Sequence, residues 1–235
     1  MKYFLLFFFL LSWKLSAQGF AVIELFTSQG CSSCPAADKN LSEIIRRAKK
    51  EGKHIVGLSF HVDYWNYIGW KDPYSSREFT ERQRKYAKEM NLNSVYTPQM
   101  IVNGQLEFVG SSKGEAEKAI DEGLKQLPSF QISILDAKLS DDEVHVKYSV
   151  DKTPNGEFLN VVVVERDAEN FVPRGENSGK TLHHDNVVRA FKTTILQRTG
   201  ELVLKISTVN SAKSSLVFYV QDKQWHVVGV TTSPL

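Results

Sequence analysis

The stretch Gly30-Cys31-Ser32-Ser33-Cys34-Pro35 holds both cysteines of this chain of 235 residues. It follows an apolar run, residues 21–26, that is typical of a strand buried on both faces, and turn-prone residues 27–30 separate the two. After the second cysteine, apolar residues recur at helical spacing at Ala37, Leu41, Ile44, Ile45 and Ala48. The pattern therefore predicts two cysteines in the first turn of a helix that directly follows a strand.

This position favours a reactive sulfur. The unpaired N–H groups and the positive end of the helix dipole stabilise a thiolate at Cys31. Cys34 is close enough to resolve a mixed disulfide formed there, and Pro35 suits an early helix position because its missing N–H is not needed. A structural disulfide and a metal site stay open, although the disulfide would close a very short loop and no second cysteine pair is present. We expect redox chemistry at an accessible Cys31 sulfur.

The first 17 residues differ from the rest of the chain. Lys2 precedes an apolar run, residues 3–13, and Leu15-Ser16-Ala17 follows with small residues. This resembles a secretory signal peptide and is short for a membrane span. It predicts cleavage after Ala17, a periplasmic or secreted protein, and no stable membrane insertion afterwards. With 29 basic and 27 acidic residues, the composition indicates neither a nucleic-acid partner nor a polybasic membrane face.

A second buried strand is predicted at residues 54–60, so the intervening helix implies a parallel pair with a right-handed crossover. In such sheets ligands gather at the carboxyl ends of the strands. His61 and Asp63 follow this strand as Cys31 follows the first one, so we expect them near the cysteines. Trp65 belongs to the aromatic segment that comes next, which either receives a partner's peptide chain or packs a loop onto the domain.

Two further features lie in the first half. Thr97-Pro98 opens a predicted hairpin whose turn is Asn103-Gly104. Glu24 lies within the first apolar strand, where it is either hard to ionise and able to exchange a proton with Cys34, or a strand-edge carboxylate that faces water.

From residue 20 to residue 127, the order strand, CxxC helix, strand, helix, Thr-Pro, hairpin and helix resembles the thioredoxin fold. In that superfamily the proline is cis and faces the cysteine pair, and the resemblance implies the same for Thr97 and Pro98. Glu24 matches the buried strand carboxylate of thioredoxin, with one extra residue before the cysteines. Ser-Ser replaces Gly-Pro between the cysteines, so redox potential and partners are not carried over.

Longer motifs resemble a second, more specific family. These are Glu24-Leu-Phe-Thr-Ser-Gln-Gly-Cys-Ser-Ser-Cys-Pro35, His61-Val-Asp-Tyr-Trp65, Gly69-Trp-Lys-Asp-Pro73, Tyr96-Thr-Pro-Gln99 and Gly175-Glu-Asn-Ser-Gly179. They are similar to the secreted proteins of unknown function numbered twelve twenty-three. The resemblance implies an exported thioredoxin-like protein with a β-rich C-terminal half, whose biochemical role is poorly defined.

In the second half, short predicted strands alternate with turn residues, a pattern typical of an antiparallel sandwich of the immunoglobulin type. We therefore predict an α/β thioredoxin-like N-terminal domain, residues 18–128, followed by an all-β sandwich, residues 129–235. The long connection 166–186 either reaches toward the cysteines or a metal, or is a surface loop. Its adjacent His183 and His184 would point to opposite faces of a strand.

These observations predict an exported thiol–disulfide oxidoreductase that needs no cofactor and acts on exported proteins with thiols or disulfides. The expected catalytic residues are Cys31, Cys34 and Glu24, and the expected substrate-binding residues are Thr97, Pro98, His61, Asp63 and Trp65. One alternative is a soft-metal protein that binds Cu(I) through Cys31, Cys34 and His61. Another is an adaptor whose cysteine pair is idle. The sequence leaves open the direction of electron transfer and the oligomeric state.

Overall fold

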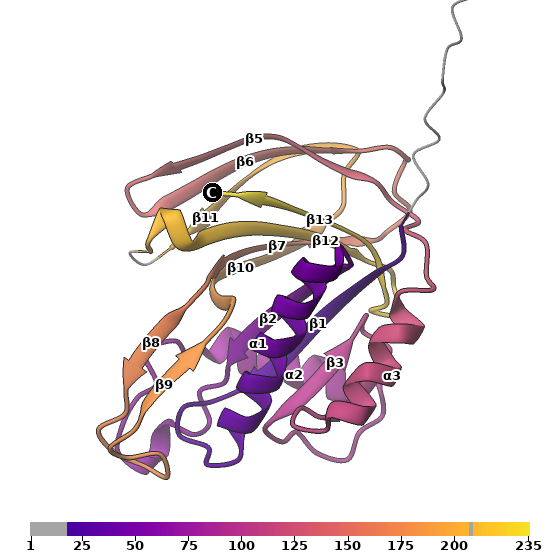
Figure 1. Ribbon diagram of the computed structural model, residues 1–235. Coiled ribbons are helices and arrows are strands. Elements are labelled where there is room, and N and C mark those ends of the chain that lie inside the picture. Colours follow the sequence, from indigo (N-terminus) through magenta and orange to yellow (C-terminus); the bar gives the residue numbers. More distant parts are fainter. Residues whose placement is uncertain (1–17, 207–208) are drawn as a thin grey trace, which may run out of the picture.

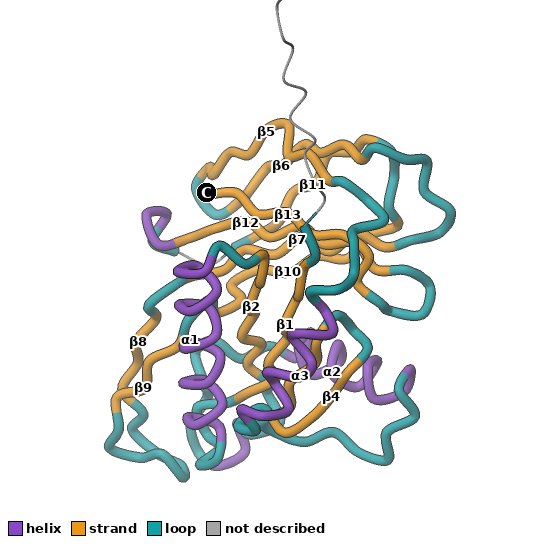
Figure 2. Tube along the Cα trace, turned by 45° about the vertical axis from the view of Figure 1, so that its right-hand side comes forward, coloured by secondary structure: helices purple, strands orange, loops and turns teal. Residues whose placement is uncertain are grey.

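The main feature of the computed structural model is one large mixed sheet. The model describes residues 18–206 and 209–235, and the predicted signal peptide, residues 1–17, lies outside them. The strands of this sheet are β1 (Phe20–Thr27), β2 (His54–His61), β3 (Gln99–Val102), β4 (Leu106–Val109), β7 (Phe158–Glu165), β10 (Val187–Ile195), β12 (Ser214–Gln221) and β13 (Val227–Pro234). Their order is β13-β12-β7-β10-β2-β1-β3-β4 (Figures 1 and 2). β1 and β2 are parallel, as the sequence predicts, and so are β2 and β10, whereas the other neighbours are antiparallel.

Three α-helices within the described residues cover both faces of this sheet: α1 (Cys34–Glu51), α2 (Arg77–Glu89) and α3 (Lys113–Gly123). Alternate residues of β1 supply the two cores, because side chains along a strand point to opposite faces. Ile23 and Leu25 pack with α1 and α3, while Val22 and Phe26 belong to the core under α2. None of the helices in the described part of the chain has the length and apolarity that crossing a membrane requires.

A second sheet covers the C-terminal strands. It contains β5 (Ile132–Ser140), β6 (Glu143–Val150) and β11 (Thr199–Lys205), in the order β11-β6-β5. Val161 and Val163 of β7 pack in the core that this sheet closes, whereas Val162 and Val164 belong to the core under α2. The remaining elements are the hairpin of β8 (Ala168–Phe171) and β9 (Thr181–His184) and two 3-10 helices, η1 (Asn66–Ile68) and η2 (Ser211–Lys213).

The predicted fold class, a thioredoxin-like α/β domain followed by an immunoglobulin-like sandwich, is wrong. Four strands from each half of the chain share the large sheet, and strand residues outnumber helical residues over the described chain as a whole. The halves join where Val187 of β10 pairs with Ser59 of β2, and the Ser59 N–H donates to the carbonyl of Asn186 at 3.0 Å. Sequence patterns identify strands but not this join, because ladder hydrogen bonds use backbone groups that every strand carries.

A turn is present at Asn103-Gly104 as predicted, but it contains three residues, 103–105, and not two, and it has a second role. It connects β3 to β4, with positive φ at Asn103 and Gly104 (50° and 67°). The side-chain oxygen of Asn103 accepts from the Val22 N–H at 2.7 Å, and its carbonyl accepts from the Val227 N–H at 2.9 Å. Through these hydrogen bonds, the turn holds β1 and the start of β13 together.

Candidate functional site

The cysteine pair lies between the end of β1 and the start of α1. Cys31 and Cys34 form a disulfide, with their Cα atoms 5.4 Å apart. The Cys34 N–H donates to the carbonyl of Cys31 at 3.2 Å, and the Ser33 hydroxyl lies 3.3 Å from the Cys31 sulfur. The helix begins at Cys34, with Pro35 in its first turn. The predicted strand–disulfide–helix junction is thus present.

The expectation of an accessible sulfur is wrong for this disulfide form. The exposed fractions of Cys31 and Cys34 are 1% and 0%, whereas Ser32 and Ser33 between them are exposed. A partner molecule therefore cannot reach either sulfur unless a neighbouring segment moves.

One such neighbour is residues 173–180, which connect β8 to β9 and are named here the cover segment (Figure 1). The fully buried side-chain amide of Asn177 donates to the carbonyls of Gln29 and Cys31, at 3.0 and 2.9 Å. The Glu176 carboxylate accepts from the Ser32 N–H at 2.8 Å, and this contact with Ser32 lowers the pKa of Glu176. Of the two interpretations of connection 166–186, the structure therefore supports the one in which it reaches the cysteine loop.

The Ile68 side chain packs closely against both the cysteine loop and the cover segment. A Cβ atom added to Gly30 would lie 2.8 Å from the Ile68 Cδ1 atom, and one added to Gly175 would lie 2.4 Å from it. Gly175 also has a φ of +88°, which side chains disfavour. Ile68 therefore fills the space between the cysteine loop and the cover segment.

Trp65 and Thr97 meet beside this loop. The indole N–H of Trp65 donates to the Thr97 hydroxyl at 2.8 Å, and the Cβ of Trp65 would lie 3.2 Å from a Cβ on Gly30. The Thr97–Pro98 peptide bond is cis. The structure thus brings these predicted residues to the cysteine loop, and Trp65 packs the loop as well as presenting a ring there.

His61 is fully buried at the end of β2 and is paired with a residue that the sequence analysis missed. Its Nδ1 atom lies 2.7 Å from the Asp72 carboxylate. Burial acts to lower the pKa of His61, but the charge and hydrogen bond of Asp72 outweigh it, so this pKa is raised. Burial acts to raise the pKa of Asp72, and the interaction with His61 outweighs it in turn. Asp72 also accepts from the Gln29 N–H at 2.9 Å, which ties His61 to the cysteine loop.

His184 and Asp38 complete this buried polar cluster. His183 is exposed and His184 is buried, as expected for adjacent residues of a strand. His184 Nδ1 lies 3.5 Å from Asp38 Oδ1, and the His184 and His61 ring centroids are 4.7 Å apart. The sequence carried a signal for Asp38, a carboxylate four residues after Cys34 among apolar helix positions, and for Asp72, which lies in a quoted motif. Neither signal indicates which partner the carboxylate meets.

Glu24 and Asp63 are placed elsewhere. The buried Glu24 carboxylate binds Arg82 of α2 through two hydrogen bonds, of 2.5 and 2.7 Å, and Tyr86 through one of 2.6 Å. The Asp63 carboxylate accepts from the Thr80 hydroxyl of α2 at 2.5 Å. Within the described residues no hydrogen bond joins either carboxylate to a cysteine.

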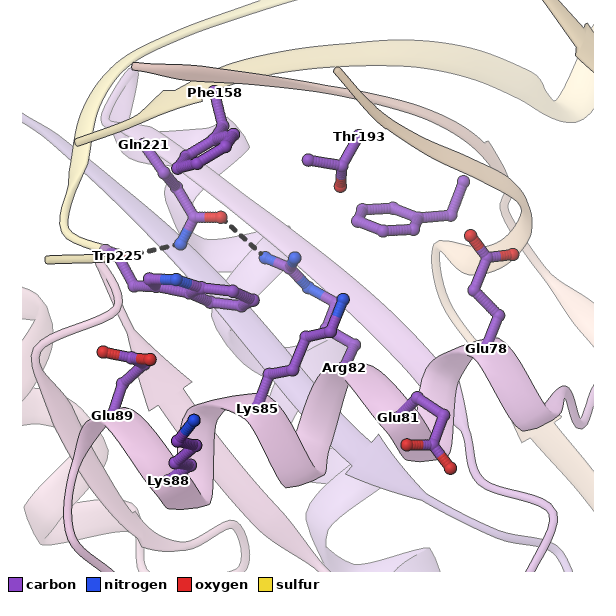
Figure 3. Close-up of a pocket in the computed structure, with 11 residues that line it drawn as sticks. Glu78, Glu81, Arg82, Lys85, Lys88, Glu89, Phe158, Thr193, Gln221 and Trp225 are labelled. Atoms are coloured by element: carbon purple, nitrogen blue, oxygen red, sulfur yellow. Dashed lines mark hydrogen bonds between the residues drawn. The ribbon is translucent and has the colours of Figure 1, made fainter. Parts of the chain in front are cut away.

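Arg82 also borders a cavity of about 570 Å³ on the α2 side of the sheet (Figure 3). Trp225 and Gln221 line it with Arg82, and Arg82 Nη2 donates to the Gln221 side-chain oxygen at 3.1 Å. None of the site residues predicted from the sequence lines this cavity.

Within residues 18–206 and 209–235, no group of three or more His, Cys, Asp or Glu side chains is arranged to hold a metal ion. His61, the predicted third ligand of the copper alternative, directs Nδ1 to Asp72, and its Nε2 atom has no hydrogen-bond partner among the described residues.

Comparison with known proteins identifies the family. Residues 22–221 match the family described as Protein of unknown function (DUF1223), and the chain belongs to it. A crystal structure of a protein from Agrobacterium tumefaciens is 31% identical, with a TM-score of 0.61, over 90% of this chain and 92% of that one. OgpA from Akkermansia muciniphila matches at 13% identity and a TM-score of 0.28, over 45% of this chain and 28% of that one. A β-glucuronidase from Ruminococcus gnavus matches at 16% identity and a TM-score of 0.25, over 47% of this chain and 17% of that one. No curated protein matches the chain.

Proposed function

We propose that this protein is an exported thiol–disulfide oxidoreductase whose redox centre is the Cys31–Cys34 pair. The observation that carries the proposal is a disulfide between residues three apart at the start of an 18-residue helix. A disulfide that closes so short a loop adds little chain-entropy stabilisation, so a purely structural role explains it poorly. A helix N-terminus, by contrast, favours the thiolate that reacts with disulfides. Export rests on the N-terminal sequence.

The exchange proceeds in two balanced steps. In the reduced protein the Cys31 thiolate attacks a partner disulfide, forms a mixed disulfide and releases one partner thiolate. The Cys34 thiolate then attacks the Cys31 sulfur, which closes the Cys31–Cys34 disulfide and releases the second partner thiolate. Two electrons pass to the partner, and the reverse sequence oxidises a dithiol.

Access to Cys31 requires opening of the cover segment. Trp65, Thr97 and Pro98 then form the wall against which an extended partner chain lies. The support for this role is the packing of Trp65 against Gly30 of the cysteine loop, the hydrogen bond from Trp65 to Thr97, and the burial of both sulfurs when the segment is closed.

A stable mixed disulfide tests the proposal. The reduced Cys34→Ala protein, treated with 5,5′-dithiobis(2-nitrobenzoate), is expected to release one thionitrobenzoate and to keep the other bound to Cys31. Reduced wild-type protein releases two, because Cys34 completes the exchange. Intact-mass spectrometry and the absorbance of released thionitrobenzoate measure both. The Cys31→Ala protein is the matched control and should react slowly; a wild-type protein that releases no thionitrobenzoate contradicts the proposed function.

Loosening the cover segment should speed reduction of the disulfide. Asn177→Ala removes two hydrogen bonds to the cysteine loop, each contributing about 1 kcal/mol, and 1.4 kcal/mol corresponds to a factor of about ten. The loss of about 2 kcal/mol in total is therefore expected to raise the rate of reduction by dithiothreitol about thirtyfold, as followed by alkylation and mass spectrometry. Ser178→Ala is the control, because that hydroxyl bonds to Pro173 within the segment. Equal rates for both variants would show that the segment does not limit access.

A further inference from the structure

Four buried side-chain atoms beside the cysteine loop have no hydrogen-bond partner among the described residues. They are Asp38 Oδ1, Ser59 Oγ, His61 Nε2 and His184 Nδ1. Their residues are at most 4% exposed and lie on α1, β2 and β9. Native proteins leave few buried polar atoms unpaired, and clusters of them mark sites with a chemical role. Asp38 follows Cys34 by four residues, which places the two side chains on one face of α1, about 5–6 Å apart at Cβ.

The hydrogen bonds around His184 show which of its two ring nitrogens carries the proton. The side-chain oxygen of Gln29 accepts from Asn170 at 2.9 Å, so the Gln29 nitrogen is the atom that faces His184 Nε2 at 2.9 Å. A donor in that position requires Nε2 to be the acceptor, and the ring proton therefore lies on Nδ1. That N–H faces Asp38 Oδ1 at 3.5 Å, while Asp38 Oδ2 accepts from the Thr27 hydroxyl at 3.2 Å. If a second proton reaches the His184–Asp38 pair, Asp38 Oδ1 is therefore the atom that accepts it.

We propose that Asp38 exchanges a proton with the buried Cys34 sulfur during the redox step, and that His184 positions the Asp38 carboxylate for it. The inference rests on the proposed function and deepens it. When the mixed disulfide at Cys31 is resolved, the Cys34 thiol gives its proton to Asp38 Oδ1, and its sulfur electron pair forms the new bond to Cys31. The bond between Cys31 and the partner sulfur breaks at the same time, and the partner leaves as a thiolate. In the reductive direction Asp38 returns a proton to the Cys34 thiolate. A buried thiolate without this exchange would be a costly unpaired charge.

Asp38 borders a hollow of about 450 Å³ between α1 and β9, which Pro35 and His184 also line. Asp38 Oδ1 itself is buried, so passage of the proton to this hollow requires the lining side chains to move. The charged or titratable groups at this hollow are Lys39, Arg46, Asp167, His183 and Asp185, and those on the buried side are His61, Asp72 and Arg189.

Reaction with 5,5′-dithiobis(2-nitrobenzoate) separates the two chemical steps, because each releases one thionitrobenzoate. Stopped-flow absorbance of reduced protein should show a first phase from Cys31 and a second from resolution by Cys34. Asp38→Asn is expected to slow the second phase by about tenfold or more while changing the first by less than about twofold, since loss of a general base costs at least that much. The rate of the second phase should also change with pH in wild-type protein, and that change should be absent from the Asp38→Asn protein. Glu43→Gln is the control and should match wild type, because Glu43 is a half-exposed carboxylate on the same helix that pairs with Lys113.

A second variant covers the case in which Asp38→Asn fails to fold. Thr27→Val removes the hydroxyl that bonds Asp38 Oδ2, so the carboxylate holds its proton more tightly and the midpoint of the second phase should move to higher pH. A folded Asp38→Asn protein with an unchanged second phase, or a Thr27→Val protein with an unmoved midpoint, overturns the proton-exchange role. In either case the mixed disulfide of Cys34→Ala would still form, and its absence would instead contradict the proposed function.

Discussion

Replacing Arg82 with methionine is expected to lower the free energy of unfolding by about 3–5 kcal/mol, because it leaves the buried Glu24 carboxylate without its cation. Arg82 and Glu24 side chains are only 4% and 2% exposed, and they form a bidentate ion pair. Burial acts to lower the pKa of Arg82, but the Glu24 charge outweighs it and the pKa is raised well above the usual value.

Several neighbours depend on this guanidinium. Its carbon lies 4.7 Å from the ring centroid of Phe191 and 5.0 Å from that of Tyr86, so methionine replaces packing but not cation–π attraction. Arg82 also donates to the Tyr219 hydroxyl at 2.8 Å, which links α2 to β12. The loss should therefore loosen the helix from the C-terminal strands (Figure 3).

Urea unfolding followed by circular dichroism measures this effect. Arg84→Met is the matched control: Arg84 lies on the same helix, is 55% exposed and, among the described residues, forms an ion pair with Glu81 alone, so its loss should cost less than about 1 kcal/mol. Glu24→Leu combined with Arg82→Met should recover part of the lost stability, since replacing a buried pair by apolar groups is less harmful than removing one partner. A loss below 1 kcal/mol for Arg82→Met would contradict the account of a buried, charged pair.

Gly104→Ala is expected to destabilise the protein by about 3 kcal/mol or more. Gly104 has a φ of +67°, which costs a residue with a side chain about 1–2 kcal/mol. An added Cβ would also lie 2.0 Å from the carbonyl oxygen of Trp225, a backbone atom that cannot rotate away. The turn must then separate from the segment before β13, and the hydrogen bond between the Val227 N–H and the Asn103 carbonyl is lost.

Gly52→Ala separates the two causes of this effect. Gly52 ends α1 with a φ of +65°, and an added Cβ there meets nothing within 4 Å. It should therefore show the conformational cost alone, and thermal unfolding of both variants measures the difference. Equal losses for the two glycines would mean that the contact with Trp225 has no structural weight.

Parts of the candidate site follow from local sequence. The helical spacing after Cys34 predicts α1, the residues before Cys31 predict the turn, and strand alternation predicts that His183 and His184 face opposite ways. Each of these depends on residues that are neighbours in the chain, so a short window contains the physical cause. The same holds for the Asn103-Gly104 turn, where both residues adopt positive φ.

What the sequence determined by itself is therefore local: a cysteine pair at a strand–helix junction, the positions of the turns, and which residues of a strand share a face. The tertiary structure alone decided that β10 pairs with β2 and that Asn177 donates a hydrogen bond to the Cys31 carbonyl. It also decided that Asp38 lies beside His184, and that Glu24 forms an ion pair with Arg82 and does not lie against Cys34. Hydrophobic patterning specifies that a face is buried but carries no information about which distant segment buries it. A buried carboxylate likewise requires a partner, and the fold determines which cation or donor lies within reach.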